Sequence, residues 1–129
     1  MAVTLIDPPG LPVIDVYRQV SVATGSRLVH VAGQVDWDGA GELGAQVERC
    51  FHNVATALAG VGASFADVVK LTLHVVDWAP GKMPEVVEAM DRAYTKLGVE
   101  ARPPASLFGI VALDVPEHLA ELEAVAVLD

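Results

Sequence analysis

The sequence predicts an α+β fold in which two helices cover one face of a mixed β-sheet, with the elements in the order ββαβαββ. Apolar residues recur at helical spacing in two segments, whereas five other segments show the alternation or the β-branched content of strands. The succession of strand, helix and strand in the middle of the chain favours parallel pairing there. An antiparallel hairpin is expected at the N-terminal end.

Residues 8–12, rich in proline, are expected to lie extended over the surface. Residues 18–23 (RQVSVA) and 28–32 (LVHVA) then alternate like strands, and the intervening Gly25-Ser26 predicts a turn that joins them as a hairpin. The first helix is expected to begin near Gln46, because apolar residues from there to Leu58 are spaced by three and four and two glycines follow.

The second half of the chain predicts a strand, a helix and two more strands. Residues 68–76 (VVKLTLHVV) are rich in β-branched side chains. Residues 83–97 have helical apolar spacing, with Pro84 in the first turn and Gly98 at the position of a left-handed cap. Residues 106–113 and 119–127 complete the sheet. The central strands are apolar on both faces, so the face without helices needs a second cover, and we expect an obligate oligomer with its sheets facing inward.

Length and composition indicate one domain over residues 1–129. The chain is 53% hydrophobic and 19% charged, which excludes a disordered tail. No apolar run reaches the roughly 18 residues of a membrane-spanning helix, and the N-terminus lacks a signal-peptide pattern, so no membrane contact and a cytoplasmic location are expected. Eight Lys and Arg residues against 17 Asp and Glu residues give a net charge of −9, which disfavours nucleic acid as a partner.

Several potential motifs have plainer explanations. The segment Gly39–Gly44 (GAGELG) fits a dinucleotide fingerprint in spacing, but it does not follow its strand directly, and we interpret it as a glycine-rich turn. The four histidines lack the spacing of metal ligands, so no metal site is expected. His30 and His74 either line a pocket or are satisfied in the core or an interface. Cys50 is expected to be a small buried side chain.

Two sets of charged residues leave their roles open. Glu121 and Glu123 share a strand face with apolar neighbours; they mark either an exposed edge or a carboxylate in a subunit cleft, suited to positioning water or moving a proton. Arg102 precedes a strand in the rigid segment RPPAS. It is either a surface arginine or a group that binds an anionic ligand.

Taken together, separated pieces of the sequence resemble the Rid family of reactive intermediate deaminases, also called YjgF/YER057c/UK114. The matching pieces span about 110 residues and are Tyr17, Ala32–Gln34 (AGQ), Gln46, Asn53, Gly62–Asp77, Tyr94, Arg102–Ser106 (RPPAS) and Glu121–Val127.

The resemblance implies a chorismate-mutase-like fold of the bacillus type and a homotrimer with a central β-barrel. It places small-molecule ligands in clefts between subunits. Deaminating members hydrolyse 2-aminoacrylate-type enamines and imines without a metal or an organic cofactor. Ribonuclease activity has also been attached to the family, but the charge of −9 and the lack of a basic cluster count against it here.

The resemblance also implies the site residues. Glu121 would be the acid/base, and Tyr17 and Gly33 match the family's cleft. In the family, an arginine of the motif RPARS binds the substrate carboxylate, and Ala105 stands at that arginine's position. Further cleft positions are Arg102, which matches the motif's other arginine, Ser106, Ala32 in place of a usual serine, and Asp91 in place of a usual asparagine.

Two hypotheses follow from the alanine at position 105, where the family has an arginine. In the first, the chain is a Rid-like trimer that acts on an imine, an enamine or a related compound but is not an ordinary 2-imino acid deaminase. In the second, the trimer is not catalytic and binds a metabolite or a protein partner through the same cleft.

Overall fold

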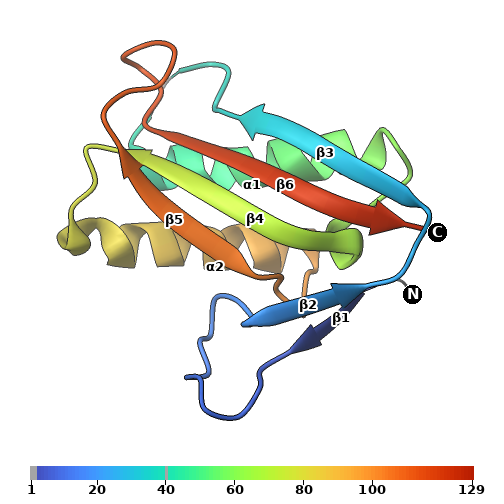
Figure 1. Ribbon diagram of the computed structural model, residues 1–129. Coiled ribbons are helices and arrows are strands. Elements are labelled where there is room, and N and C mark those ends of the chain that lie inside the picture. Colours follow the sequence, from blue (N-terminus) through green and yellow to red (C-terminus); the bar gives the residue numbers. More distant parts are fainter. Residues whose placement is uncertain (1–2, 40) are drawn as a thin grey trace.

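The computed structural model describes residues 3–39 and 41–129 and shows a β-sheet with both helices on one side of it (Figure 1). The strands are β1 (Val3–Ile6), β2 (Val20–Ala23), β3 (Arg27–Gln34), β4 (Val68–Val76), β5 (Ala105–Ile110) and β6 (Ala120–Leu128). The helices are α1 (Leu43–Ala59) and α2 (Met83–Leu97), with short 3-10 turns η1 (Phe65–Asp67) and η2 (Pro80–Lys82). The predicted α+β class is confirmed, and all seven expected elements occur in the expected order, preceded by one further strand, β1.

The main sheet has four strands in the order β3-β6-β4-β5. Strands β4 and β5 are parallel, as the sequence predicts, with Leu71 opposite Ala105. Strand β6 runs antiparallel to both of its neighbours, and its Glu121 lies opposite His74 of β4. The last strand of the chain therefore lies in the middle of the sheet, beside a residue that is about 47 positions earlier in the sequence.

The predicted hairpin between β2 and β3 is wrong. Strand β2 pairs with β1 in a separate two-stranded sheet, so the start of the chain forms a strand, whereas β3 pairs with β6. The turn at Gly25-Ser26 carries the chain past the end of β6: the Ser26 amide donates to the Leu128 carbonyl at 3.0 Å. A Cβ atom on Gly25 would lie 2.4 Å from that carbonyl oxygen, so glycine permits the close passage.

Two predicted boundaries also move. Strand β5 ends at Ile110 rather than at position 113. The Asp77 amide donates a hydrogen bond to the Ile110 carbonyl at 3.1 Å, and the next residue of the chain, Val111, is 95% exposed. Helix α1 begins at Leu43, one turn before the predicted start. The expected left-handed cap of α2 is confirmed at Gly98, which has φ 69°.

The hydrophobic core lies between the helices and the sheet. Its centre is an aromatic group in which the Phe51 ring lies 5.2 Å from that of Tyr94 and 6.1 Å from that of Phe65. Strand residues Leu71, Leu73 and Val75 are buried beneath it, as alternate residues of β4 facing the helices must be. Burial of this face is the main source of the fold's stability.

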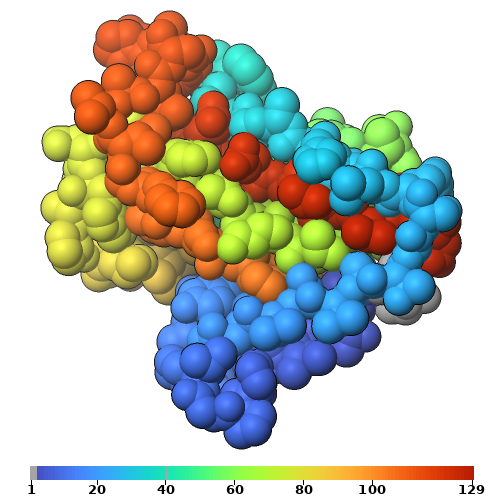
Figure 2. Space-filling model, viewed as in Figure 1, coloured from blue at the N-terminus to red at the C-terminus, as the bar shows by residue number. Residues whose placement is uncertain are grey.

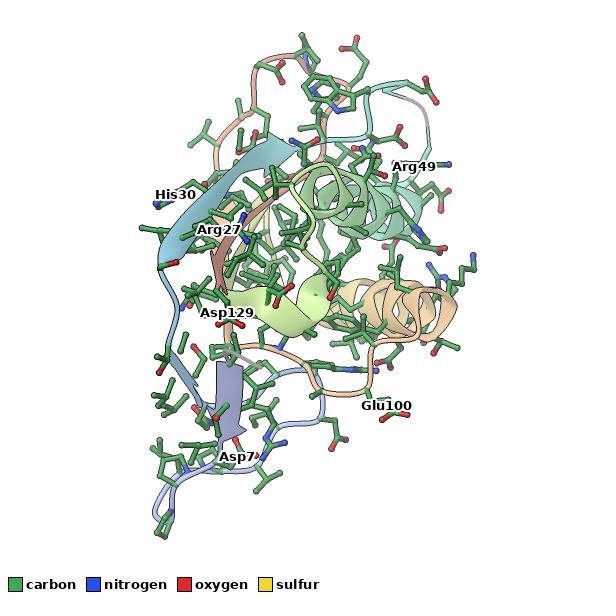
Figure 3. All side chains as sticks on the ribbon, turned by 90° about the vertical axis from the view of Figure 1, so that its right-hand side faces the viewer. Asp7, Arg27, His30, Arg49, Glu100 and Asp129 are labelled. Atoms are coloured by element: carbon green, nitrogen blue, oxygen red, sulfur yellow. The ribbon has the colours of Figure 1, made fainter. Side chains whose placement is uncertain are left out.

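The opposite face of the sheet, here called the open face, is covered by none of the elements formed by residues 3–39 and 41–129 (Figures 1 and 2). It carries the remaining alternate residues, among them apolar ones that are strongly exposed: Leu28 is 64% and Phe108 is 54% exposed. His30 of β3 also points away from the helices (Figure 3). Apolar surface of this kind is typical of a face that packs against another surface.

Neither α1 nor α2 has the length and apolar character that crossing a membrane requires.

Candidate functional site

The Glu121 carboxylate lies against the backbone of the neighbouring strand. The pairing of β3 with β6 is irregular between Val31 and Gln34, and this irregularity brings Gly33 beside Glu121. A Cβ atom on Gly33 would lie 2.3 Å from Cδ and 2.5 Å from Oε1 of Glu121. Glycine at position 33 therefore creates the space that the carboxylate occupies.

His74 lies across from this carboxylate on β4. Its Nδ1 is 3.9 Å from Oε1 of Glu121, which is beyond hydrogen-bond distance, and this buried nitrogen has no hydrogen-bond partner among the described residues. The imidazole stacks on Phe108, with ring centroids 6.0 Å apart. The side chains of His74 and Glu121 are 23% and 30% exposed. A carboxylate acceptor and an imidazole at this spacing can hold a water molecule or move a proton between them.

A second feature is an apolar cavity of about 100 Å³, here called the Ala105 cavity. It lies between α2, the β4–β5 pair and the segment that precedes β2, and it brings together Tyr17, Ala105 and Ser106. Its other walls are Val, Leu, Met and Phe side chains, mainly from β4 and α2. Three of the predicted cleft residues thus share one small hydrophobic space.

Glu121 and Ala105 do not meet within one chain. Ala105 is opposite Leu71 and Glu121 is opposite His74, so they are separated by two strands across the sheet and three residues along it. Standard strand dimensions make this roughly 14 Å. Ala105 and Glu121 also lie on different faces of the sheet. Ala105 is on the same face as its partner Leu71, which is buried beneath the helices, whereas Glu121 is on the open face with its partner His74. A site that uses both residues therefore has to draw them from different copies of the chain.

Arg102, in the segment after α2, and Asp91, on that helix, form a separate cluster. The Arg102 guanidinium donates from Nη1 to Oδ1 of Asp91 at 2.5 Å and lies 4.7 Å from the centre of the Tyr94 ring. Neither Arg102 nor Asp91 lines the Ala105 cavity. Within the chain, the arginine that the sequence singled out is thus bound to a carboxylate and an aromatic ring.

Ala32 lies in a wider hollow of about 380 Å³ on the open face, together with His30, Lys70, Thr72 and Glu123. Lys70 donates from Nζ to Oγ of Ser106 at 2.8 Å. The site predictions omitted Lys70 and did not pair His74 with Glu121. The available signal was the alternation in residues 68–76, which places these side chains on one face, but the register that puts them beside β6 could not be seen in the sequence.

The remaining sequence features are structural. Cys50 is fully buried, as predicted, and burial raises the pKa of its thiol to about 12. Gly39 and Gly41 have φ values of 64° and 104°, as expected for a glycine-rich turn, while Ala40 between them lies outside the described residues. In the part of the chain that the structure describes, no three His, Cys, Asp or Glu side chains gather around a possible metal position.

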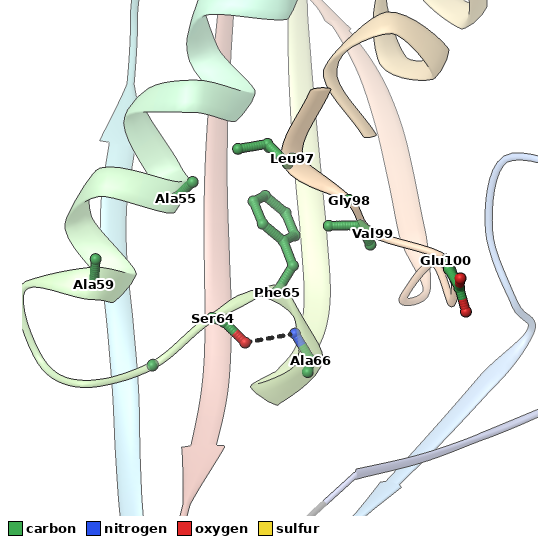
Figure 4. A pocket seen from close by; sticks show the side chains of 10 residues that line it. Ala55, Ala59, Ser64, Phe65, Ala66, Leu97, Gly98, Val99 and Glu100 are labelled. Atoms are coloured by element: carbon green, nitrogen blue, oxygen red, sulfur yellow. Dashed lines mark hydrogen bonds between the residues drawn. The ribbon is translucent and has the colours of Figure 1, made fainter. Parts of the chain in front are cut away.

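A hydrophobic pocket of about 410 Å³ lies apart from these features, at the ends of the two helices (Figure 4). Its walls include Ala55, Phe65, Leu97 and Val99, and the Ser64 hydroxyl caps η1 by accepting a hydrogen bond from the Ala66 amide at 3.2 Å. Of its lining residues, Glu100 alone is ionisable. Apart from this carboxylate and the Ser64 hydroxyl, which is engaged in the cap, its described lining residues have apolar or no side chains.

Comparisons with known proteins agree with the fold. The family model described as Endoribonuclease L-PSP matches residues 11–128. The crystal structure of YyfB from Yersinia pestis, a protein of unknown function in the conserved Rid protein family, is 29% identical, covers 99% of this chain and 100% of its own, and superimposes with a TM-score of 0.84. Rv2704 from Mycobacterium tuberculosis, of the highly conserved YjgF/YER057c/UK114 family, is also 29% identical over 98% and 100% of the two chains, with a TM-score of 0.65.

The structure of TdcF from E. coli with bound serine is 23% identical over 98% and 99% of the two chains, with a TM-score of 0.68, and shares the fold. None of the curated proteins matches the sequence.

Proposed function

Because the chain belongs to the Endoribonuclease L-PSP family, which includes the Rid and YjgF/YER057c/UK114 proteins, we propose that it is a homotrimer that hydrolyses a small imine or enamine in clefts between its subunits. The observation that carries this proposal is the Glu121 carboxylate, which lies against Gly33 and 3.9 Å from a His74 nitrogen that has no hydrogen-bond partner within residues 3–39 and 41–129. The cleft would join Glu121 of one subunit to the Ala105 cavity of another.

The proposed reaction needs only a positioned water and proton transfer. The Glu121 carboxylate accepts a hydrogen bond from water and directs its oxygen to the imine carbon, while the imine nitrogen gains a proton. The resulting carbinolamine loses ammonia as its C–N bond breaks, and a carbonyl compound remains. An enamine enters the same sequence after a proton moves from its nitrogen to its carbon. Atoms and electrons balance without an oxidant or a reductant.

The trimer is supported by the open face. Three copies with their sheets turned inward around a central barrel would cover Leu28 and Phe108, which are more than half exposed in the single chain. Val125 lies near the middle of this face and is half-buried. We expect light scattering to give the mass of three chains, and Val125→Asp to reduce it to one. A wild-type protein that stays monomeric at micromolar concentration would refute the assembly.

Ala105 sets the limit of the activity. An alanine cannot form the bidentate contact that an arginine makes with a carboxylate, and Arg102 is already bound to Asp91. Loss of such a charged contact reduces turnover by about 10²-fold or more. We therefore propose that the substrate is not an ordinary 2-imino acid.

The test is hydrolysis of enzymatically generated 2-iminopropionate beside imines without a carboxylate, with Glu121→Gln as the decisive variant. The expected result is slow turnover of 2-iminopropionate, faster turnover of an uncharged imine, and a loss of about 10²-fold in Glu121→Gln. Glu88→Gln, the same chemical change at an exposed position of α2, is the matched control. Family-like rates on 2-iminopropionate that persist in Glu121→Gln would contradict the proposal.

The alternative is a trimer that binds a metabolite or a protein partner without catalysis, and the missing arginine at position 105 favours it. A ligand that raises the melting temperature and is recovered unchanged supports this alternative. A ligand that is consumed supports the hydrolase.

A further inference from the structure

We propose that the Ala105 cavity is a subsite for a short uncharged aliphatic group, so that the substrate is the imine or enamine of a small aliphatic aldehyde or ketone. This inference rests on the proposed function and names the substrate class of the same cleft. Three observations carry it: the chemistry of the cavity walls, the engagement of the nearby arginines, and the size of the cavity.

Among the described residues that line the Ala105 cavity, Tyr17 alone has an ionisable side chain, its phenol. Ser106 also borders the cavity, but it lies opposite Thr72 in the β4–β5 pairing, so its side chain is on the open face, where its hydroxyl accepts a hydrogen bond from Lys70 at 2.8 Å. The remaining lining is aliphatic, thioether or aromatic, with Leu71, Leu73 and Phe51 at its inner side. A carboxylate placed here would lose its hydration without gaining a cation, whereas an alkyl group would gain contacts on all sides.

The arginines that border this region in the sequence are occupied. Arg102, three residues before Ala105, is held by Asp91 and by the Tyr94 ring. Arg18, next to Tyr17, donates from Nε to Oδ2 of Asp7 at 2.8 Å. Freeing Arg18 would break its ion pair with Asp7, whose side chain is only 12% exposed. Freeing Arg102 would give up its contacts with Asp91 and the Tyr94 ring, and these losses disfavour both arginines as substitutes for one at position 105.

Cavity size limits the ligand. An apolar cavity of about 150 Å³ holds a benzene molecule, so a cavity of about 100 Å³ accommodates roughly four carbon atoms. The cavity is open on one side rather than enclosed, and Met83, which is 43% exposed, is among the residues that line it. A four-carbon aldimine, with its alkyl chain in the cavity and its C=N group outside, matches these limits.

The test compares two unreactive probes of equal length, butyramide and butyrate, by ligand-observed NMR titration of the full-length protein. Butyramide is expected to bind at least tenfold more tightly than butyrate. Ala105→Arg, which introduces a guanidinium, is expected to reverse this order. Equal or tighter binding of butyrate by the wild type, or no binding of either probe, would overturn the proposal.

A second variant tests the location. Ala105→Leu fills the cavity and is expected to weaken butyramide binding at least tenfold while the protein keeps its cooperative thermal transition. Ala105→Val, which fills less, should give an intermediate loss and covers the case in which leucine disturbs folding. Unchanged butyramide binding in a folded Ala105→Val protein would place the ligand elsewhere and refute the subsite.

The outcomes separate this inference from the function on which it rests. Tight butyramide binding by a protein that hydrolyses no imine would contradict the hydrolase and leave the subsite standing. Hydrolysis that depends on Glu121 in a protein that does not bind butyramide would contradict the subsite and leave the hydrolase standing.

Discussion

The two faces of the main sheet are made by the same strands and differ in what their residues do. On the face beneath the helices, Leu71, Leu73 and Val75 are at most 4% exposed. On the open face, the residues between them, Thr72 and His74, are partly exposed, and His74 approaches Glu121. Strand alternation thus lets one segment stabilise the fold through one set of side chains and present the other set at the proposed site. Substitutions should accordingly separate by face.

The largest expected effect is on the helix-covered face. Phe51 is 1% exposed and contacts both Phe65 and Tyr94, so Phe51→Ala should lower the free energy of unfolding by about 3–5 kcal/mol. Urea denaturation followed by circular dichroism measures this loss. A truncation to alanine on the open face, Thr72→Ala, should cost less than about 1 kcal/mol. Similar losses in the two variants would remove the distinction between the faces.

At Gly33, on the open-face side, a substitution is expected to lower activity and leave the free energy of unfolding nearly unchanged. A Cβ atom there collides with the end of the Glu121 side chain, which is flexible and can move away. Gly33→Ala should therefore reduce imine hydrolysis by about 10²-fold, the loss also expected for Glu121→Gln, and change the free energy of unfolding by less than about 1 kcal/mol.

The control for this prediction is Gly81→Ala, since a Cβ atom at position 81 has no neighbour within 4 Å. It should leave both quantities unchanged. If Gly33→Ala retains full activity, the position of the Glu121 carboxylate is not important for the reaction.

A smaller effect is expected from the buried thiol of Cys50. Burial raises its pKa from 9.0 to about 12, so the unfolded chain loses this proton at lower pH than the folded chain does. The thiol's contribution to stability is complete below pH 9 and is lost as the pH rises toward 12. Burial also raises the pKa of Tyr94, which acts in the same direction.

Chemical denaturation at pH 8 and pH 10 tests this. Between these values, the Cys50 contribution should fall by about 1 kcal/mol, and Cys50→Ala should remove that part of the decline while the Tyr94 part remains. An identical decline in wild type and Cys50→Ala would show that the thiol is not shielded from water.

The sequence predicted what depends on neighbours along the chain. The spacing of apolar residues gave both helices, Gly98 gave the cap of α2, and the alternation in residues 68–76 gave a strand with two different faces. The prediction was wrong where distant segments compete to pair with the same strand, because local propensity does not say whether β2 should pair with β3 or with β1.

The same limit applies to the candidate site. Glu121 stood out because it is an acid in an apolar strand, and Gly33 matched the family. The approach of His74 to Glu121 depends on the register of β4 against β6, and the Arg102–Asp91 contact depends on how the segment after α2 folds back along that helix. Such contacts are set by the packing of the whole chain and leave no mark in a single sequence.

The smallest effect is expected on the outer surface of the helices. A helix residue there should contribute little, because it is burial against the sheet that stabilises the fold. Glu48 of α1 accepts hydrogen bonds from Lys96 at 2.5 Å and Arg92 at 2.9 Å on α2, and these two contacts lower the pKa of its carboxyl group. The two cations are 60% and 47% exposed, so solvent screens them, and Glu48→Gln should cost only about 0.5 kcal/mol at pH 7. Because the folded-state pKa is lowered, the contribution is present above pH 4.5 and is lost as the pH falls through the folded-state value. Urea denaturation at pH 7 and pH 3 should therefore show a smaller difference between wild type and Glu48→Gln at pH 3 than at pH 7. A loss at pH 7 comparable to that of Phe51→Ala would mean that these ion pairs contribute as much as the core.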